Sequence, residues 1–555
     1  MAGVERETVM RMARELLGQG MDEVRAADAA RRLNSLLGWT RALDEERLLP
    51  GGPAGGFDPG LPFKPANPDA AWATVVPPLT GTGYGAPPPG APGKAESDQP
   101  PSGVPIPPGI TAWPMLELRR ALAGGRVTAE EAVEACLSRI TDLDAHLRAF
   151  ITVTADGARE AARRPDQGAA KELDGVPVAV KDVFDTAGVR TTCGSRILAG
   201  RIPEADAALV ARLRRAGAII VGKTNTHEFA FGVTTANPHH GTCRNPWNPG
   251  RVPGGSSGGS AVAVATGMCY LALGTDTAGS VRIPAACCGI VGFKPTYGLM
   301  STQGIFPLSW SLDHPGTLTR TVTDAATAVT ALTGIDHGRR DGEADLGGLV
   351  VGLPAGWLDD RVRPEVKAAV QAAIGLLEKQ GARVKEVPFP PVHPLLLSNR
   401  LIVLAEAGAL HRPWLARQAD AYGADVRARL ELGQLLPAMD YLTGLRLRRE
   451  LCEAVAATMQ DVDLLLTPTL PVPPPRIGES WLEWPDGQEA APDALIRLTA
   501  PFNVTGQPAI SIPCRMSGGL PAGVQIIGRW FEDRTVLGAA LALESAQRTA
   551  GLTIV

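Results

Sequence analysis

After residue 113, short apolar segments alternate with helical patterns, and this alternation restricts the folds that the chain can adopt. The helical patterns cover residues 206–216, 364–380 and 533–547. Because helices fill the long spacings between the apolar segments, we expect a mixed, partly parallel α/β sheet with helices on both faces. With 555 residues, 45% of them apolar, the chain can build one large domain or two smaller ones. The predicted strands are residues 176–180, 218–222, 270–273, 349–353, 464–466, 509–512 and 524–527.

The chain before this alternation has a different composition. Residues 1–66 are predicted to form an N-terminal helical extension, since Ala29, Leu33, Leu36 and Leu37 recur at helical spacing. Residues 67–112 are rich in Pro and Gly, which indicates a linker or an extended arm. Residues 113–555 then form the main domain.

The main domain opens with a helix-start pattern. Thr128 and Glu131 have the spacing of a capping box, in which each side chain bonds the other residue's backbone N–H. We therefore expect an amphipathic helix that begins after Thr128 and runs through Ile140.

Charge and cysteine usage exclude several classes of function. A net charge of −4 argues against a nucleic-acid-binding surface. The eight cysteines form no C-x-x-C pair and no Cys/His metal spacing, so we expect small buried residues in a reduced compartment, with no metal and no other cofactor. The N-terminus is polar, and the longest apolar run, residues 260–273, is too short to span a membrane. A cytoplasmic location is the default.

Two glycine-rich turns and one lysine carry the chemistry. The turns lie at residues 253–260 and 274–282, and each contains serine. Glycine allows a sharp turn and lets a substrate approach main-chain N–H groups. Lys181 follows the apolar segment Val178-Ala-Val180, so burial could leave its amine neutral near pH 7 and able to act as a base. This combination indicates a hydrolase with a serine nucleophile and a lysine base.

Several long motifs in one order resemble the amidase signature family, and the resemblance covers about 440 residues from Thr111 onward. It implies one large α/β domain with a twisted mixed central sheet flanked by helices, so that residues 113–555 would be an amidase signature catalytic domain acting on a small-molecule amide. The motifs are Gly175-Val-Pro-Val-Ala-Val-Lys-Asp182, Gly254-Gly-Ser-Ser-Gly-Gly-Ser260, Asp276-Thr-Ala-Gly-Ser-Val-Arg282, Gly292-Phe-Lys-Pro-Thr-Tyr-Gly298 and Ser311-Leu-Asp-His-Pro-Gly316.

The resemblance also implies the catalytic residues. Ser280 would be the nucleophile, Ser256 the bridging serine that follows a cis Gly255–Ser256 peptide, and Lys181 the base. Neutral Lys181 would draw a proton from Ser256, which would draw one from Ser280. The leaving amine would receive a proton back through the same relay.

The turn that holds Ser280 is expected to supply the oxyanion hole. Its donors would be the backbone N–H groups of Thr277, Ala278, Gly279 and Ser280. Asp276 and Arg282 flank the turn and are expected to form a structural ion pair that holds it. Gly255 and Ser257 are expected to support the bridging serine.

Two generic motifs allow other interpretations. Residues 217–224 fit the phosphate-loop pattern, but the four residues between its glycines, Ala-Ile-Ile-Val, indicate a buried strand. Residues 254–258 fit the G-x-S-x-G nucleophile elbow, so an α/β-hydrolase esterase that uses Ser256 stays open. Its histidine would be one of His314, His337, His393 and His411.

The substrate is less constrained than the chemistry. Family members that act on glutamine or asparagine have an aspartate several residues before an Asn-x-x-Gly-x-Pro motif. Here that motif is Asn503-Val-Thr-Gly-Gln-Pro508, and the nearest preceding acid is Asp493. This favours an apolar or aryl amide, with ester and carbamate activity allowed by the same acyl chemistry, over a glutaminase-type amidotransferase subunit. Phe306, Trp310 and Phe502 are candidate pocket walls.

The N-terminal extension has two interpretations. It could be a dimerisation or capping element, and a homodimer is compatible with the sequence. It also resembles the small helical partner protein that wraps some amidases of the family, here fused to the catalytic chain.

Overall fold

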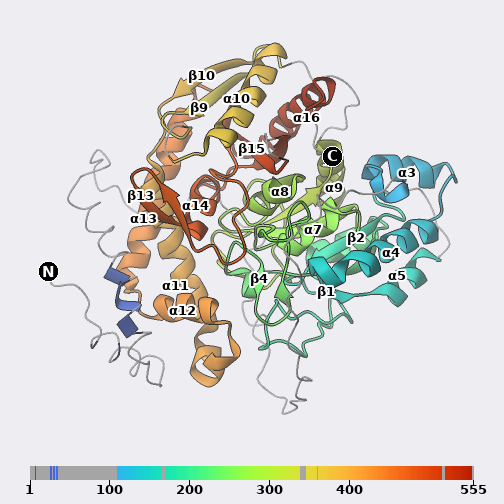
Figure 1. Cartoon of the computed structure of the whole chain (residues 1–555), viewed down its shortest axis with the longest axis horizontal. Coiled ribbons are helices and arrows are strands. Elements are labelled where there is room, and N and C mark those ends of the chain that lie inside the picture. The colour runs from blue at the N-terminus through green and yellow to red at the C-terminus, as the bar shows by residue number, and fades with distance from the viewer. Residues whose placement is uncertain are drawn as a thin grey trace.

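The computed structural model describes residues 109–163, 171–337, 346–358, 361–515 and 519–552, together with Glu7, Met10 and several residues between Ala26 and Asn34. Within this part of the chain, a mixed sheet of eleven strands runs through the centre of the molecule (Figure 1). Its strands, in spatial order, are β1 (Phe150–Val153), β3 (Ile219–Thr224), β2 (Pro177–Lys181), β6 (Leu271–Asp276), β8 (His314–Thr319), β7 (Val291–Lys294), β14 (Ala509–Arg515), β15 (Pro521–Gly528), β11 (Leu464–Pro468), β9 (Val350–Pro354) and β10 (Arg383–Val387).

The seven predicted strands are all present, and the mixed α/β fold is confirmed. Strand β2 runs parallel to β3 and β6, and β9 runs parallel to β10 and β11, whereas the other neighbours are antiparallel. Strands β2, β3, β6 and β11 are buried at every residue. Both of their faces are covered, which explains why they appear as continuous apolar runs in the sequence. Strands β1, β7, β8 and β10 were not predicted.

Helices cover the two faces of the sheet. In Figure 1, α4 and α5 lie beside the β1 end of the sheet, and α10 and α16 lie beside β15 near the other end. The helices of the main domain are α3 (Met115–Ala123), α4 (Ala129–Leu147), α5 (Ala155–Ala162), α6 (Ala208–Arg215), α7 (Gly258–Ala265), α8 (Arg282–Cys288), α9 (Val322–Thr333), α10 (Pro364–Lys379), α11 (Val392–Gln418), α12 (Ala424–Gln434), α13 (Ala438–Thr458), α14 (Ala491–Arg497), α15 (Pro501–Val504) and α16 (Asp533–Thr549). None of the described helices is long and apolar enough to cross a bilayer.

The capping box of α4 is confirmed. The Thr128 hydroxyl accepts a hydrogen bond from the Glu131 N–H at 3.1 Å, and the Glu131 carboxylate accepts one from the Thr128 N–H at 2.8 Å. The helix continues past Ile140 to Leu147. All eight cysteines are free and buried, as their spacing in the sequence predicted.

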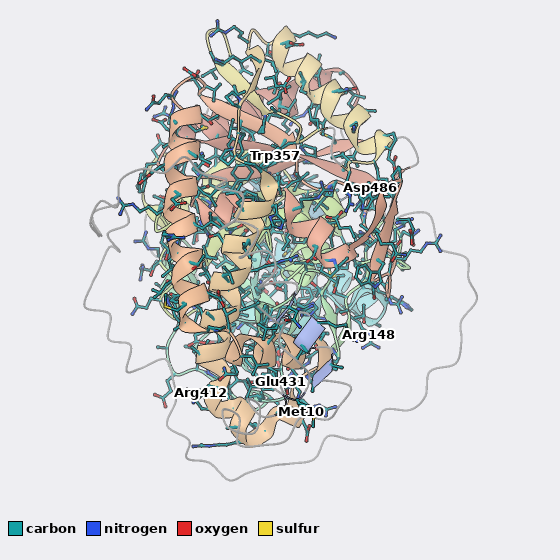
Figure 2. All side chains as sticks on the ribbon, turned by 90° about the vertical axis from the view of Figure 1, so that its left-hand side faces the viewer. Met10, Arg148, Trp357, Arg412, Glu431 and Asp486 are labelled. Atoms are coloured by element: carbon teal, nitrogen blue, oxygen red, sulfur yellow. The ribbon has the colours of Figure 1, made fainter. Side chains whose placement is uncertain are left out.

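The described residues of the N-terminal extension are helical and pack on the catalytic domain. Ala29 and Leu33 are buried, and their cluster includes Leu432 and Leu435 at the end of α12. Met10 packs against the same cluster, and Figure 2 shows Met10 and Glu431 at the same end of the molecule. The rest of residues 1–66, with Leu36 and Leu37, lies outside the described residues, as does the predicted arm up to residue 108. The 3-10 turn at Ile110–Ala112 contacts the main domain, because the Tyr270 hydroxyl donates to the Ile110 carbonyl.

Candidate active site

Lys181 ends strand β2 and is fully buried. Its Nζ lies 2.8 Å from Ser256 Oγ and 2.7 Å from Thr275 Oγ1. Burial lowers the pKa of the Lys181 amine from its ordinary 10.5 to about 7, although the carboxylates of Asp313 and Asp276 oppose this shift. A neutral amine has a lone pair that can accept the Ser256 proton, so the pair is suited to general-base chemistry.

The acid next to Lys181 faces away from it. Asp182 accepts hydrogen bonds from the Thr192 N–H at 2.9 Å and from the Thr192 hydroxyl at 2.6 Å, and it lies 3.6 Å from Lys223 Nζ. Neighbouring side chains in extended backbone point to opposite sides, which accounts for the separation of Lys181 and Asp182.

Ser256 lies in a turn that tolerates only a small residue before it. The Gly255–Ser256 peptide is cis, as the resemblance implied. A Cβ at Gly255 would lie 2.8 Å from Thr235 Oγ1 and from the Thr234 nitrogen, so glycine is required there. The Thr235 hydroxyl donates to the Gly254 carbonyl at 2.9 Å and holds this turn from outside. Thr235 was not predicted.

Ser280 lies in the turn between β6 and α8, next to the bridging serine's turn. The Ser257 N–H donates to the Ser280 carbonyl at 3.2 Å, and the Ser257 hydroxyl donates to the Thr275 carbonyl at 3.2 Å. Ser257 therefore joins the two turns. The Ser280 hydroxyl has no hydrogen-bond partner among the residues that the structure describes, so only the Lys181–Ser256 link of the predicted relay is formed in this geometry.

The predicted oxyanion hole requires one correction. The Gly279 N–H donates to Asp276 Oδ1 at 2.8 Å, so this donor is already used to hold the turn. Within the described part of the chain, the N–H groups of Thr277, Ala278 and Ser280 have no acceptor. The four predicted donors therefore reduce to these three.

The predicted ion pair between Asp276 and Arg282 is confirmed. The fully buried guanidinium bonds both carboxylate oxygens, at 2.8 Å and 3.0 Å. Arg282 also donates to Gln525 Oε1 at 2.6 Å and to Asn503 Oδ1 at 2.7 Å. Although burial raises the pKa of the Asp276 carboxyl, the charge and hydrogen bonds of Arg282, together with Lys294 and Asn503, hold that pKa below its usual range. Asp276 therefore stays ionised and can hold the turn through its backbone N–H groups.

Several supporting residues that lie within or directly beside the sequence motifs were not predicted. Thr275 lies one residue before the motif that contains Ser280, and Asn503 opens the Asn-x-x-Gly-x-Pro motif. Asp313, from the motif at residues 311–316, accepts a hydrogen bond from the Thr277 hydroxyl at 2.6 Å. Their positions within or directly beside the motifs were a usable signal. Gln525 had no such signal, because it lies in an apolar strand.

The other sequence motifs do not form separate sites. Residues 219–224 form strand β3, as expected, and not a phosphate-binding loop. Lys223 donates to the Phe184 carbonyl at 2.6 Å. In the part of the chain that the structure describes, no group of three or more His, Cys, Asp or Glu side chains is placed to hold a metal ion.

Known proteins share this fold and much of this sequence. The profile of the family described as "Amidase" matches residues 131–537. An amidase from Pseudomonas putida is 43% identical over 458 residues, which cover 79% of this chain and 96% of that protein. A glutamyl-tRNA(Gln) amidotransferase subunit from Moorella thermoacetica is 38% identical over 470 residues, covering 78% of this chain and 96% of that protein. A crystal structure of an amidase superimposes with a TM-score of 0.73 at 36% identity, covering 78% of this chain and 99% of that one.

The family match spans most of the residues that the structure describes, and it includes the turns that hold Lys181, Ser256 and Ser280. It excludes the α/β-hydrolase family for this chain. The chain belongs to the amidase signature family and is an amidohydrolase.

Proposed function

We propose that this protein hydrolyses the C–N bond of a small apolar or aryl amide through an acyl-enzyme on Ser280. Lys181 is the base and Ser256 carries protons between Lys181 and Ser280. The observation that carries this proposal is the buried amine of Lys181, with a pKa lowered to about 7, at 2.8 Å from Ser256 Oγ.

The reaction follows from these roles. Lys181 accepts the Ser256 proton while Ser256 accepts the Ser280 proton, and Ser280 Oγ attacks the amide carbon. The negative oxygen of the tetrahedral intermediate accepts hydrogen bonds from the free N–H groups of Thr277, Ala278 and Ser280. When the C–N bond breaks, the relay returns its proton to the leaving amine. Water then attacks the acyl group through the same relay and releases the carboxylic acid.

An aromatic cluster supports the apolar or aryl substrate. The Phe306 N–H donates to the Val183 carbonyl at 2.8 Å, which puts Phe306 beside a residue only two positions along the chain from Lys181. The half-buried Phe306 ring stacks on the half-buried Trp414 at 5.8 Å between centroids, and Phe229, 5.1 Å from Phe306, belongs to the buried core. Phe502, by contrast, is fully buried against Trp357 and belongs to the core, so it is not a pocket wall.

A glutaminase-type amidotransferase subunit is the second candidate, and the 38% identity to the Moorella thermoacetica protein favours it. The aspartate that such family members have several residues before the Asn-x-x-Gly-x-Pro motif has no counterpart here, and the nearest preceding acid, Asp493, pairs with Arg400 at 2.5 Å. We therefore place it second.

One substrate panel tests both candidates. Acyl p-nitroanilides of increasing chain length, matched p-nitrophenyl esters, aryl carbamates, glutamine and asparagine are assayed with the wild type and with Ser280→Ala. We expect turnover of apolar anilides and esters by the wild type and none by the variant. Near-wild-type turnover by purified Ser280→Ala would reject the nucleophile, and ammonia release from glutamine in preference to the anilides would favour the second candidate.

A further inference from the structure

The turn that holds Ser280 is fixed by side chains from distant parts of the chain. Asn399 of helix α11 donates from Nδ2 to the Thr277 carbonyl at 3.2 Å. Thr499, which follows α14, donates from Oγ1 to the Ala278 carbonyl at 2.6 Å. Each of these bonds holds one peptide group of the turn by its carbonyl oxygen.

A bond to a carbonyl also sets the direction of the N–H in the same peptide. In a planar trans peptide the C=O and the N–H point in opposite directions, and among the described residues the cis bond is Gly255–Ser256. The Ala278–Gly279 peptide illustrates this rule. Thr499 holds its carbonyl, and on the opposite side its N–H reaches Asp276 Oδ1 at 2.8 Å.

The preceding peptide, Thr277–Ala278, has the same arrangement with one difference. Asn399 holds its carbonyl, but no acceptor in the described part of the chain takes the Ala278 N–H on the opposite side. An N–H that is oriented by a buried side chain and left without an acceptor is available for the oxyanion of a substrate.

We propose that Asn399 is a positioning residue, which orients the Thr277–Ala278 peptide so that its N–H stabilises the oxyanion. This role rests on the function proposed above. Asn399 touches no reacting atom, and it acts through the peptide that it holds.

Hydrogen bonds to Glu406 hold helix α11 in place close to Asn399. Asn399 is buried, and Glu406 lies seven residues further on, on the same face of the helix. The buried Glu406 carboxylate accepts a hydrogen bond from the Ser309 hydroxyl at 2.6 Å and from the Tyr441 hydroxyl at 3.1 Å. Ser309 lies in the loop between β7 and β8, and the same loop contacts the turn of Ser280, because Asp313 accepts a bond from the Thr277 hydroxyl. Asn399 is therefore held against the turn by the loop that also supports Thr277.

The neighbouring residue provides a matched control. Ser398 is also buried on α11, and its hydroxyl donates to the Gly444 carbonyl of α13 at 2.9 Å. Ser398→Ala removes a buried bond to a backbone carbonyl from the same helix without touching the oxyanion turn.

The test compares Asn399→Ala and Asn399→Asp with Ser398→Ala, using the best anilide of the panel and phenylboronic acid, which forms a tetrahedral adduct with a serine hydroxyl. Asn399→Asp keeps the shape of the side chain but removes the donor, so it replaces Asn399→Ala if the latter does not fold. For the Asn399 variants we expect kcat to fall about tenfold or more, KM to stay within about twofold, and boronate affinity to fall with kcat. We expect changes within about twofold for Ser398→Ala.

Three results would overturn the positioning role while Ser280→Ala remains inactive. The first is an unchanged kcat in the Asn399 variants, and the second is a change in their KM alone. The third is a fall of kcat and boronate affinity in Ser398→Ala as large as the fall in the Asn399 variants. Activity in Ser280→Ala would instead reject the proposed nucleophile, and this role with it.

Discussion

Replacing Lys181 by Met removes a buried group that the fold keeps neutral at a cost in stability. Burial lowers the pKa of this amine from 10.5 to about 7. One pKa unit corresponds to about 1.4 kcal/mol, so the shift corresponds to about 5 kcal/mol of lost stability when the unfolded chain is protonated and the native amine is not. We expect Lys181→Met to be inactive and, at pH 7, at least as stable as the wild type.

The stability of the wild type relative to Lys181→Met should depend on pH. Between pH 7 and pH 10, the unfolded chain binds a proton at Lys181 and the native protein does not, so wild-type stability rises with pH relative to the variant. The difference should grow in favour of the wild type by about 1.4 kcal/mol per pH unit, or about 4 kcal/mol in all. The buried Lys223 and Lys294 are present in both proteins, so their titration cancels.

Urea unfolding of both proteins at pH 7, 8, 9 and 10 measures this difference through the two midpoints. In parallel, wild-type kcat/KM on the best anilide should fall about tenfold per pH unit below pH 7, because the base becomes protonated. A midpoint difference that does not change with pH, together with full activity at pH 5, would refute a neutral Lys181.

Three further predictions concern the turn and its surroundings. Asp276→Asn leaves the buried Arg282 without its counter-charge, so we expect a loss of about 3–5 kcal/mol, seen as a lower thermal midpoint; an unchanged midpoint would contradict the role of this ion pair. In Gly279→Ala the new Cβ would lie 2.2 Å from Thr499 Oγ1, at a φ of +126°, so activity should fall at least about tenfold. Gly200→Ala is the control, because no atom lies within 4 Å of its new Cβ, and its activity should not change. Exhaustive chelation should leave hydrolysis unchanged, and activity lost with chelator and restored by a divalent ion would show that the mechanism is incomplete.

The residues of the candidate site could be located from the sequence because the motifs hold them within short segments. Lys181 ends an apolar strand, and Ser256 and Ser280 lie in glycine-rich turns, so local sequence carries both the residue and its backbone. The hydrogen bond from the Gly279 N–H to Asp276 could not be predicted from that pattern, because it depends on the direction in which the Asp276 carboxylate points.

Strand β8 and helix α11 were missed for the same physical reason. Both contain proline, which usually ends a strand or a helix. In β8, Pro315 lies opposite Thr275 between two neighbouring strands, and in α11 Pro413 lies inside the helix. Tertiary packing outweighs local preference in both. Asn399 is 122 residues from Thr277 along the chain, and no sequence spacing relates them.

Mass spectrometry of a trapped acyl-enzyme tests the central claim most directly. Wild-type protein is mixed with a slowly deacylating aryl carbamate, digested and mapped. The account predicts a carbamoyl group on the peptide that contains Ser280, with none on Ser256, and a much slower appearance of this adduct in Lys181→Ala. An adduct on Ser256, or one that forms in Lys181→Ala as fast as in the wild type, would contradict it.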